Sequence, residues 1–310
     1  MASLARIRIG TRGSPLALAQ AHMVRELLCK LHGFDAADVS IRIIKTTGDQ
    51  VQNRKLSEVG GKGLFTKEIE VALAAQEIDL AVHSAKDMPT ALPDGLMIAA
   101  CPQREDARDA LICDKAKTFA ALNKNATLGT ASLRREAQVR RLRPDIRVQP
   151  LRGNVETRLR KVRDGDIDAT ILGMAGLNRL GLTAEVAESL STEMFLPAVG
   201  QGTVAIETRE DDTTTRDFLR AIDHAETSDA LLAERAFLAV LEGSCRTPIA
   251  GYAEIFGAKL RFRGLVMRPD GSESHETARD GSVADAVKIG ADAAEELKAK
   301  LSPGFFAALA

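Results

Sequence analysis

The chain has 310 residues, of which 45% are hydrophobic and 27% are charged, and its formal net charge is -1. This length predicts two or three domains with sizeable cores. The near-neutral charge argues against a general nucleic-acid-binding protein, and no apolar run is long enough to cross a membrane. The first residues lack the apolar core of a signal peptide, so we expect a cytoplasmic protein. The four cysteines form no Cys-x-x-Cys pair and the five histidines no ligand set, so no metal site is predicted.

The N-terminal part predicts a strand, a tight turn and a helix. A strand at residues 7–9 is followed by Gly-Thr-Arg-Gly-Ser and by a helical pattern over residues 15–31. Ser14 suits the N-cap of that helix and Pro15 its first position. The free N–H groups of the helix start, together with Arg12, indicate an anion-binding site. Simple capping by Ser14 is the alternative interpretation.

A glycine-rich segment follows the second predicted strand, residues 39–45. Residues 53–63 lack periodicity and contain Gly-Gly-Lys-Gly, which indicates a mobile loop. It is not a Walker A motif, because the Gly-x4-Gly-Lys-Ser/Thr spacing is absent. Residues 64–76 then return to a helical period.

The next strand, residues 78–82, is apolar enough to be buried on both faces, and Met88-Pro89 ends it. It leads into Ser84, Lys86 and Asp87. Because ligands bind at the carboxyl ends of strands in open α/β sheets, these three residues are candidate site residues. A carboxylate there can stabilise a developing positive charge or move protons, whereas a surface ion pair with Lys86 is the alternative.

The order of elements then repeats. Residues 127–132 lead into a helix at residues 133–142, as residues 9–14 lead into the first helix. Arg152-Gly153, a helix and a strand at residues 167–171 repeat the order seen from Lys62-Gly63 onward. We therefore predict two α/β domains of the same plan that share a cleft, with a hinge where the chain crosses near residues 102–104 and 197–202.

The C-terminal part has a different character. A helix at residues 227–241 precedes Cys245, and strands at 249–256, 260–267 and 272–279, with a hairpin turn at 269–271, precede a helix at 283–301. The neighbouring Arg246 favours a reactive thiol at Cys245, which is either a covalent anchor or a nucleophile. The predicted domains are residues 1–102 with 203–220, residues 103–202, and an α+β domain at residues 221–310.

A basic segment lies between residues 133 and 163, where eleven Lys and Arg residues face three acidic residues, an excess of eight positive charges. A solvated surface, a nucleic-acid patch and a pocket for a polycarboxylate or phosphate are the three alternatives. The segment has no aromatic residue on which bases could stack, which disfavours single-stranded nucleic acid. Arg134 and Arg135 lie in the first helical turn, where two cations cost stability unless an anion is bound. Arg152 and Arg158 flank a glycine-assisted turn, and we group these four arginines as candidate anion ligands.

Seven motifs in order resemble the porphobilinogen deaminase family over the whole chain. They are Gly-Thr-Arg-Gly-Ser-Pro-Leu-Ala-Leu (10–18), Val-Gly-Gly-Lys-Gly-Leu-Phe (59–65), Val-His-Ser-Ala-Lys-Asp-Met-Pro (82–89), Gly-Thr-Ala-Ser-Leu-Arg-Arg (129–135), Arg-Gly-Asn-Val-Glu-Thr-Arg-Leu (152–159), Leu-Pro-Ala-Val-Gly-Gln-Gly (196–202) and Leu-Glu-Gly-Ser-Cys (241–245). The resemblance implies two domains similar to type II periplasmic binding proteins, followed by a small α+β domain with a three-stranded antiparallel sheet.

The resemblance also implies an activity. A dipyrromethane cofactor would be joined to Cys245 by a thioether, and four porphobilinogen molecules would be condensed onto it with loss of ammonia. Water would then release hydroxymethylbilane, and the enzyme would be a monomer.

By the same resemblance, Asp87 is the catalytic residue. The cofactor- and substrate-binding residues would be Arg12, Ser14, Gln20, Lys62, Phe65, Ser84, Lys86, Thr130, Ser132, Arg134, Arg135, Arg152, Asn154, Arg158 and Gln201. Two residues depart from the family pattern: Ala131 stands where many members have a second serine, so one cofactor hydrogen bond would come from elsewhere, and Gly13 stands where relatives often have a larger polar residue. A solute-binding protein for a small polycarboxylate, without turnover, is the alternative function.

Overall fold

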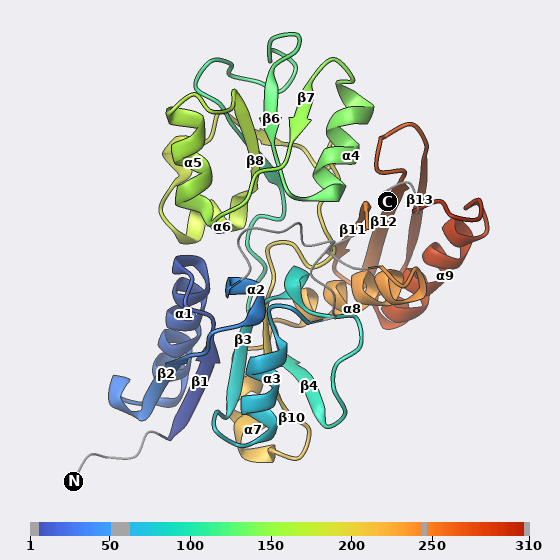
Figure 1. Ribbon diagram of the computed structural model, residues 1–310. Helices are drawn as coiled ribbons and strands as arrows, with labels where there is room; N and C mark the ends of the chain where they lie inside the picture. The colour runs from blue at the N-terminus through green and yellow to red at the C-terminus, as the bar shows by residue number, and fades with distance from the viewer. Residues whose placement is uncertain (1–5, 51–62, 244–246, 307–310) are drawn as a thin grey trace. The chain divides into compact units, whose positions relative to one another are not determined.

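The computed structural model describes residues 6–50, 63–243 and 247–306 (Figure 1). The chain divides into two compact units: unit 1 contains residues 1–105 and 203–228, and unit 2 contains residues 106–202 and 229–310. In the described ranges, no helix is both long enough and apolar enough to span a membrane. In the described residues, unit 1 contains one sheet and unit 2 contains two.

The sheet of unit 1 has five strands in the order β2-β1-β3-β10-β4. β1 is parallel to β2 and β3, and β10 is antiparallel to β3 and β4. The strands are β1 (Ile7–Thr11), β2 (Val39–Ile43), β3 (Leu80–Ser84), β4 (Leu96–Ala100) and β10 (Val204–Arg209). The helices are α1 (Pro15–His32), the short α2 (Thr47–Gln50), α3 (Lys67–Ala74) and α7 (Thr213–Arg220).

Alternating side chains attach these helices to opposite faces of the sheet. Leu80 and Val82 share a core with α1 and with Leu219 of α7, whereas Ala81 belongs to a separate core with α3. The two-residue period of a strand produces this division. β3 is therefore buried on both faces, as the sequence predicts.

The first sheet of unit 2 has the order β7-β6-β8-β5-β9. β6 is parallel to β7 and β8, and β5 is antiparallel to β8 and β9. The strands are β5 (Asp109–Ile112), β6 (Thr127–Gly129), β7 (Arg147–Gln149), β8 (Ala169–Gly173) and β9 (Glu188–Leu190). Helices α4 (Leu133–Leu142) and α5 (Val155–Arg163) contribute to separate cores of this sheet, and α6 (Met174–Arg179) follows β8 (Figure 1). The strand order and the one antiparallel neighbour of the central strand match unit 1, which confirms the predicted repeat.

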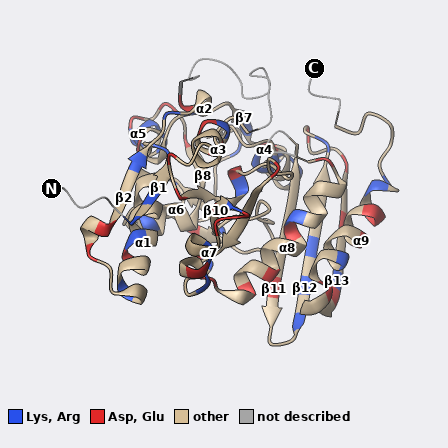
Figure 2. Cartoon of the chain, turned by 90° about the horizontal axis from the view of Figure 1, so that it is seen from below, with Lys and Arg blue, Asp and Glu red and all other residues tan. Residues whose placement is uncertain are grey.

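The C-terminal part of unit 2 is an antiparallel sheet covered by two helices. Its strands β11 (Ile249–Phe256), β12 (Lys259–Met267) and β13 (Ser274–Ser282) follow α8 (Ala225–Val240) and precede α9 (Ala286–Lys298). A Cβ atom at Gly290 of α9 would lie 2.0 Å from the Ala233 carbonyl oxygen, so glycine permits this close approach to α8. Figure 2 shows Lys and Arg mixed with Asp and Glu along β12, β13 and α9. The predicted α/β class with a final antiparallel sheet is confirmed.

Several predicted boundaries are corrected. The strand predicted at residues 78–82 is β3, and it ends in a 3-10 turn at Ala85–Asp87 rather than at Met88-Pro89. The helix predicted at 64–76 is shorter, and the last strand begins at Ser274 instead of residue 272. The predicted three-domain boundaries, the hinge and the shared cleft stay predictions.

Candidate active site

The predicted site residues of unit 1 follow the carboxyl ends of two neighbouring strands. β1 and β3 are parallel and paired, so they end at the same edge of the sheet. Arg12 follows β1, while Ser84 ends β3 and Lys86 and Asp87 lie in the 3-10 turn after it. The edge that binds ligands in open α/β sheets therefore carries all four residues.

The predicted site residues Ser84 and Ser14 both take part in hydrogen bonds with helix α1. The Gln20 amide of α1 donates to the Ser84 hydroxyl at 2.9 Å, and that hydroxyl lies 3.2 Å from Gln20 Oε1. Gln20 is 2% exposed, so this pair is held within the fold. Ser14 accepts a hydrogen bond from the Ala17 N–H at 3.3 Å and caps α1, as predicted.

Arg12 has an internal partner that the sequence did not indicate. Its guanidinium forms an ion pair with Asp49, and its Cζ lies 4.2 Å from the centroid of the Phe65 ring. Burial opposes ionisation of Asp49, but the hydrogen bonds and charge of Arg12 outweigh burial and lower the pKa of that carboxyl. Arg12 and Phe65, two predicted ligands, are thus in contact.

Asp87 differs from the other acidic residues at this edge. Its side chain is half-buried, and no hydrogen bond or ion pair joins its carboxylate to any of the residues described. Asp49, by contrast, is paired with Arg12. A half-buried carboxylate without a partner in the described ranges is available to a ligand.

A buried acidic cluster lies behind the same strand. His83 Nε2 is 3.1 Å from Glu207 Oε2, and both side chains are almost fully buried. His83 is therefore packed and hydrogen-bonded. Glu70 of α3 is 8% exposed, and burial, assisted by the charge of Glu207, raises the pKa of its carboxyl. We call Glu70, His83 and Glu207 the acidic cluster.

In unit 2 the predicted hydroxyl and amide ligands also follow strand ends. Thr130 comes after β6, and its hydroxyl accepts a hydrogen bond from the Ser132 N–H at 3.2 Å. The Ser132 hydroxyl caps α4 by accepting from the Arg135 N–H, and the Asn154 side chain caps α5 by accepting from the Thr157 N–H at 2.8 Å. Capping positions these side chains at the starts of two helices.

Arg134 and Arg135 meet a buried carboxylate rather than solvent. Arg134 Nη2 lies 2.8 Å from Asp109 Oδ2, and Arg135 Nη2 lies 2.7 Å from Asp109 Oδ1. Gln201 donates to Asp109 Oδ1 at 3.0 Å, and Arg134 Nη1 donates to the Leu196 carbonyl oxygen at 2.7 Å. The anion that two cations at a helix start require is thus supplied by the protein itself. We call Asp109, Arg134 and Arg135 the basic cluster.

The charges in the basic cluster do not cancel. Burial opposes ionisation of Asp109, but the two guanidinium charges outweigh it and lower the pKa of Asp109 to about 2. Burial lowers the pKa of Arg134, and Arg135 adds to that effect. Guanidinium groups stay protonated in proteins, so two positive charges face one negative charge and the cluster has a net charge of about +1. Arg134 Nε has no hydrogen-bond partner in the described part of the chain, although it is buried.

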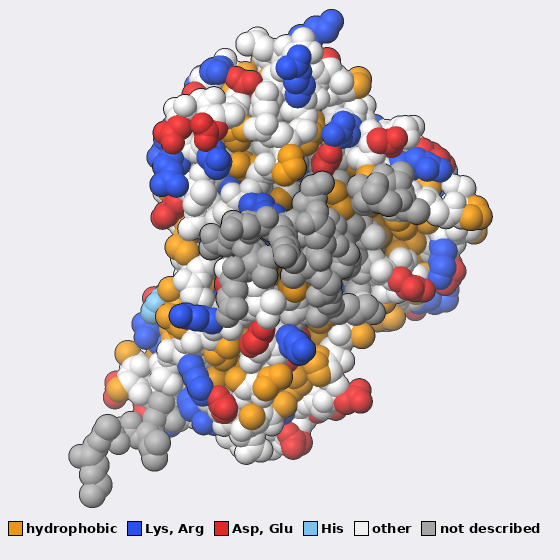
Figure 3. Space-filling model, viewed as in Figure 1, with side chains coloured by type: hydrophobic (Ala, Val, Ile, Leu, Met, Phe, Trp, Pro, Cys, Tyr) orange, Lys and Arg blue, Asp and Glu red, His pale blue; other side chains and the backbone are white. Residues whose placement is uncertain are grey.

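The other arginines of the basic segment divide into two groups. Arg140 and Arg163 form ion pairs with Glu136 and Glu185 and are partly exposed, whereas the less exposed Arg143 pairs with Asp145. Figure 3 accordingly shows basic and acidic side chains side by side over α5.

The second group consists of candidate ligands. Arg152 is half-buried, and none of the described residues forms a hydrogen bond or ion pair with its guanidinium. Arg158 donates to the Gly153 carbonyl oxygen at 2.9 Å. Arg152 thus has a guanidinium that is available to an anion.

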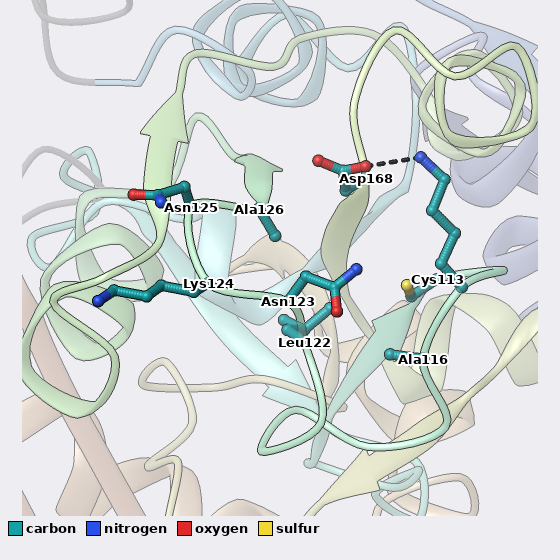
Figure 4. Close-up of a pocket in the computed structure, with 9 residues that line it drawn as sticks. Cys113, Ala116, Leu122, Asn123, Lys124, Asn125, Ala126 and Asp168 are labelled. Carbon is teal, nitrogen blue, oxygen red and sulfur yellow. Dashed lines mark hydrogen bonds and ion pairs between the residues drawn. The ribbon is translucent and has the colours of Figure 1, made fainter.

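A pocket of about 140 Å³ in unit 2 lies away from these residues (Figure 4). Asp168, which pairs with Lys115 at 2.7 Å, precedes β8, and Ala126 precedes β6. The pocket is therefore at the amino ends of strands whose carboxyl ends carry the candidate ligands. It is separate from the predicted site.

Two predicted residues, Lys62 and Cys245, lie outside the described residues. Cys101 and Cys113 are buried, in keeping with packing roles. In the part of the chain that the structure describes, no group of three or more His, Cys, Asp or Glu residues could hold a metal ion. The sequence interpretation missed Asp49 and Asp109, the internal partners of the predicted arginine ligands.

Comparison with known proteins gives matches over nearly the whole chain. Residues 7–217 match the family model described as "Porphobilinogen deaminase, dipyromethane cofactor binding domain", and residues 229–299 match "Porphobilinogen deaminase, C-terminal domain". The porphobilinogen deaminase of Nitrobacter winogradskyi is 56% identical over 298 residues, which cover 96% of this chain and 94% of that protein. The enzyme of Nitrobacter hamburgensis is 55% identical over the same length.

Solved structures show more distant similarity. The methionine-binding protein MetQ has 14% identity and a TM-score of 0.44, with 72% of this chain and 92% of that chain covered. The Bordetella pertussis BvgS VFT2 domain has 15% identity and a TM-score of 0.42, with 74% and 91% covered.

Proposed function

Because this chain belongs to the porphobilinogen deaminase family, we propose that it condenses four porphobilinogen molecules head to tail onto a bound dipyrromethane. In each addition the aminomethyl C–N bond of porphobilinogen breaks, ammonia leaves, and the methylene carbon bonds to the α-carbon of the terminal pyrrole, which loses its proton. Water finally releases hydroxymethylbilane. The protein is a transferase.

The donor set of the described residues fits the dipyrromethane. Pyrroles of this series carry acetate and propionate groups, so the cofactor and the growing product are polyanions. Unit 2 provides Arg152, which has no partner among the described residues, a basic cluster with one positive charge in excess, and the unsatisfied Nε of Arg134. Guanidinium groups bind carboxylates in bidentate geometry, which makes arginine the fitting residue type.

Asp87 carries the proposal. Its half-buried carboxylate stands at the carboxyl end of β3 without a partner among the residues described. We assign it to accept a hydrogen bond from the pyrrole N–H of the substrate and to stabilise the positive charge that develops as ammonia leaves. A fixed carboxylate stabilises such a charge without reorganisation during the step.

The remaining residues bind and orient. In unit 1, Arg12 with Phe65, and Ser84 with Gln20, offer donors to carboxylates, and Lys62 and Lys86 add positive charge. In unit 2, Thr130, Ser132, Asn154 and Arg158 are assigned the same role, and Gln201 is assigned to the site through its hydrogen bond to Asp109. The bound dipyrromethane supplies the pyrrole α-position at which the chain grows, and Cys245 is the proposed thioether anchor.

The proposal also covers the location, the oligomeric state and the domain boundaries of the protein. We place the protein in the cytoplasm, as a monomer that does not bind nucleic acid. Its domains are residues 1–102 with 203–220, 103–202 and 221–310. No observation favours the alternative of a solute-binding protein without turnover.

The test is turnover of porphobilinogen by the wild type and by Asp87→Asn, which keeps the size of the side chain and removes its charge. We expect the substitution to slow product formation by about a hundredfold or more, the scale of losing one electrostatic stabiliser. Asp94→Asn is the matched control, because Asp94 is an exposed acid of the same unit. An Asp87→Asn protein with the wild-type rate would remove Asp87 from the mechanism, and a wild type without turnover would overturn the function.

A further inference from the structure

Asp109 is the residue of the basic cluster that neither the sequence motifs nor the comparisons single out. It is the first residue of β5, directly opposite Gly173 at the carboxyl end of β8. It is fully buried, with 0% of its surface exposed. A buried carboxylate at the ligand-binding edge of a sheet is costly unless it is paired, so its partners define its role.

The two oxygens of Asp109 hold different partners. Oδ1 accepts from Arg135 Nε at 3.1 Å, from Arg135 Nη2 at 2.7 Å and from Gln201 Nε2 at 3.0 Å. Oδ2 forms an ion pair with Arg134 Nη2 at 2.8 Å and accepts no hydrogen bond from the described residues. One carboxylate thus fixes the orientation of two guanidinium groups and of an amide, all of which are candidate ligands.

The surroundings reinforce this orientation. Gln201 also donates to the Ala107 carbonyl oxygen at 2.7 Å, and Arg134 Cζ lies 5.8 Å from the Phe195 ring centroid. Arg134 is 4% exposed and Arg135 is 5% exposed. Neither guanidinium is free to find its own geometry on a surface, so the carboxylate sets where their remaining N–H groups point.

We propose that Asp109 is a positioning residue, which orients Arg134 and Arg135 and leaves their cluster one positive charge with which to receive one carboxylate of a pyrrole. The proposal rests on the proposed function and deepens it. Without Asp109 the cluster would carry two uncompensated positive charges. With Asp109 it carries one, which matches a single acetate or propionate group.

Asp109→Asn keeps the shape of the side chain but removes its charge, so it tests whether the carboxylate orients Arg134. In Asp109→Asn the amide oxygen can still accept from Arg135 and Gln201, but the amide nitrogen then faces Arg134 Nη2, donor against donor. The variant therefore releases Arg134. In Asp109→Asn/Arg134→Gln the clashing cation is gone and the cluster again carries one positive charge.

The experiment measures three quantities for each variant: kcat/KM for porphobilinogen per loaded molecule, the fraction of chains with covalently attached cofactor by intact mass, and Tm. The variants are Asp109→Asn, Arg134→Gln and the double variant. Asp145→Asn is the matched control, because it removes one Arg–Asp pair of the same unit, that with Arg143, outside the basic cluster.

We expect Asp109→Asn to lower kcat/KM by about tenfold or more, the factor for an interaction of about 1.4 kcal/mol. Cofactor loading and Tm should fall as well. The double variant should have a higher Tm than Asp109→Asn and a kcat/KM within about threefold of Arg134→Gln alone, because Asp109 acts through that arginine. If Asp109 had only a structural role, the factors by which Asp109→Asn and Arg134→Gln each lower kcat/KM would multiply in the double variant.

Three results would overturn the inference. The first is wild-type loading and turnover in Asp109→Asn. The second is a double variant whose kcat/KM is lower than that of Arg134→Gln by the same factor by which Asp109→Asn is lower than the wild type. A double variant that is too unstable to purify, while Arg134→Gln folds, would overturn the inference as well. The double variant decides between the two roles even where Asp109→Asn does not fold. Failure of the proposed function is distinct, since the wild type itself would then show no turnover.

Discussion

The two units bury ionic clusters of opposite sign on corresponding strands. In unit 1, Glu207 lies on β10, the antiparallel neighbour of β3, with His83 and Glu70 as its surroundings. In unit 2, Asp109 lies on β5, the antiparallel neighbour of β8, with two arginines. The first cluster has more acids than bases, and the second has more bases than acids.

This difference decides what can neutralise each cluster. An excess of buried carboxylates is relieved by binding a proton, and burial, with a smaller contribution from the charge of Glu207, raises the pKa of Glu70. An excess of buried guanidinium charge cannot be relieved by losing a proton, because arginine does not deprotonate in proteins. It requires an anion. The same topology therefore places a proton-binding cluster in unit 1 and an anion-attracting cluster in unit 2.

The largest expected effect on stability comes from the basic cluster. The pKa of Asp109 falls from its ordinary value of 3.8 to about 2, so its ionised form contributes about 2 kcal/mol to the free energy of unfolding at neutral pH. Because the folded pKa is the lower one, this contribution is present above pH 3.8 and is lost as the pH falls through about 2. Asp109→Asn should therefore be less stable than the wild type at pH 7, and the gap should narrow toward pH 2. Urea denaturation at a series of pH values measures the gap, and a gap independent of pH would contradict the assignment.

The acidic cluster should respond in the opposite direction. Burial raises the folded pKa of Glu70, so ionisation opposes folding and stability falls as the pH rises above the unfolded value of 4.5. Glu70→Gln removes that cost and should raise the stability at pH 7 by about 1 kcal/mol, the scale of a single substitution. The benefit should shrink below pH 4.5. Thermal unfolding of this variant beside Glu26→Gln, an exposed control, tests the sign. A destabilised Glu70→Gln at pH 7 would show that its charge is needed.

The smallest effect on stability is expected at the ion pair of Arg12 and Asp49 in unit 1, which is less buried than the basic cluster. Arg12 and Asp49 are 22% and 30% exposed, and Phe65 lies against the guanidinium. Phe65→Leu removes the cation–π contact and should cost about 0.5–1 kcal/mol. The KM for porphobilinogen should rise if Phe65 orients Arg12 for a carboxylate. Phe256→Leu, at an exposed phenylalanine, is the control, and equal KM values in the two variants would argue against that role.

The sequence predicted the elements that have strong local signals. Helix α4 begins and ends at the predicted residues 133 and 142, because Ser132 caps it and apolar positions mark its period. Strand β11 also matches, at residues 249–256. Strands β4, β5, β7 and β9 and helices α2, α6 and α7 were missed, and each of them is only three to eight residues long. Segments this short show too little periodicity to identify.

The site was predicted only in part, for a related reason. A glycine turn before a helix marks Arg12 in the sequence, whereas Ser132 and Asn154 were predicted from the family resemblance. Asp109 has no such mark, because its neighbours include other charged residues and its partners Arg135 and Gln201 lie 26 and 92 positions away. Pairing of a buried acid with distant cations is a tertiary property. It appears only when the strands are placed.

Covalent attachment of the cofactor at Cys245 is the feature on which the proposed chemistry most directly depends. The decisive measurement is the intact mass of the denatured protein, for the wild type and for Cys245→Ser. We expect a wild-type excess equal to two linked pyrrole units, which porphobilinogen extends further, and no excess in Cys245→Ser. A wild type that stays at its unmodified mass after incubation with porphobilinogen, or a Cys245→Ser protein that retains the excess, would contradict the account.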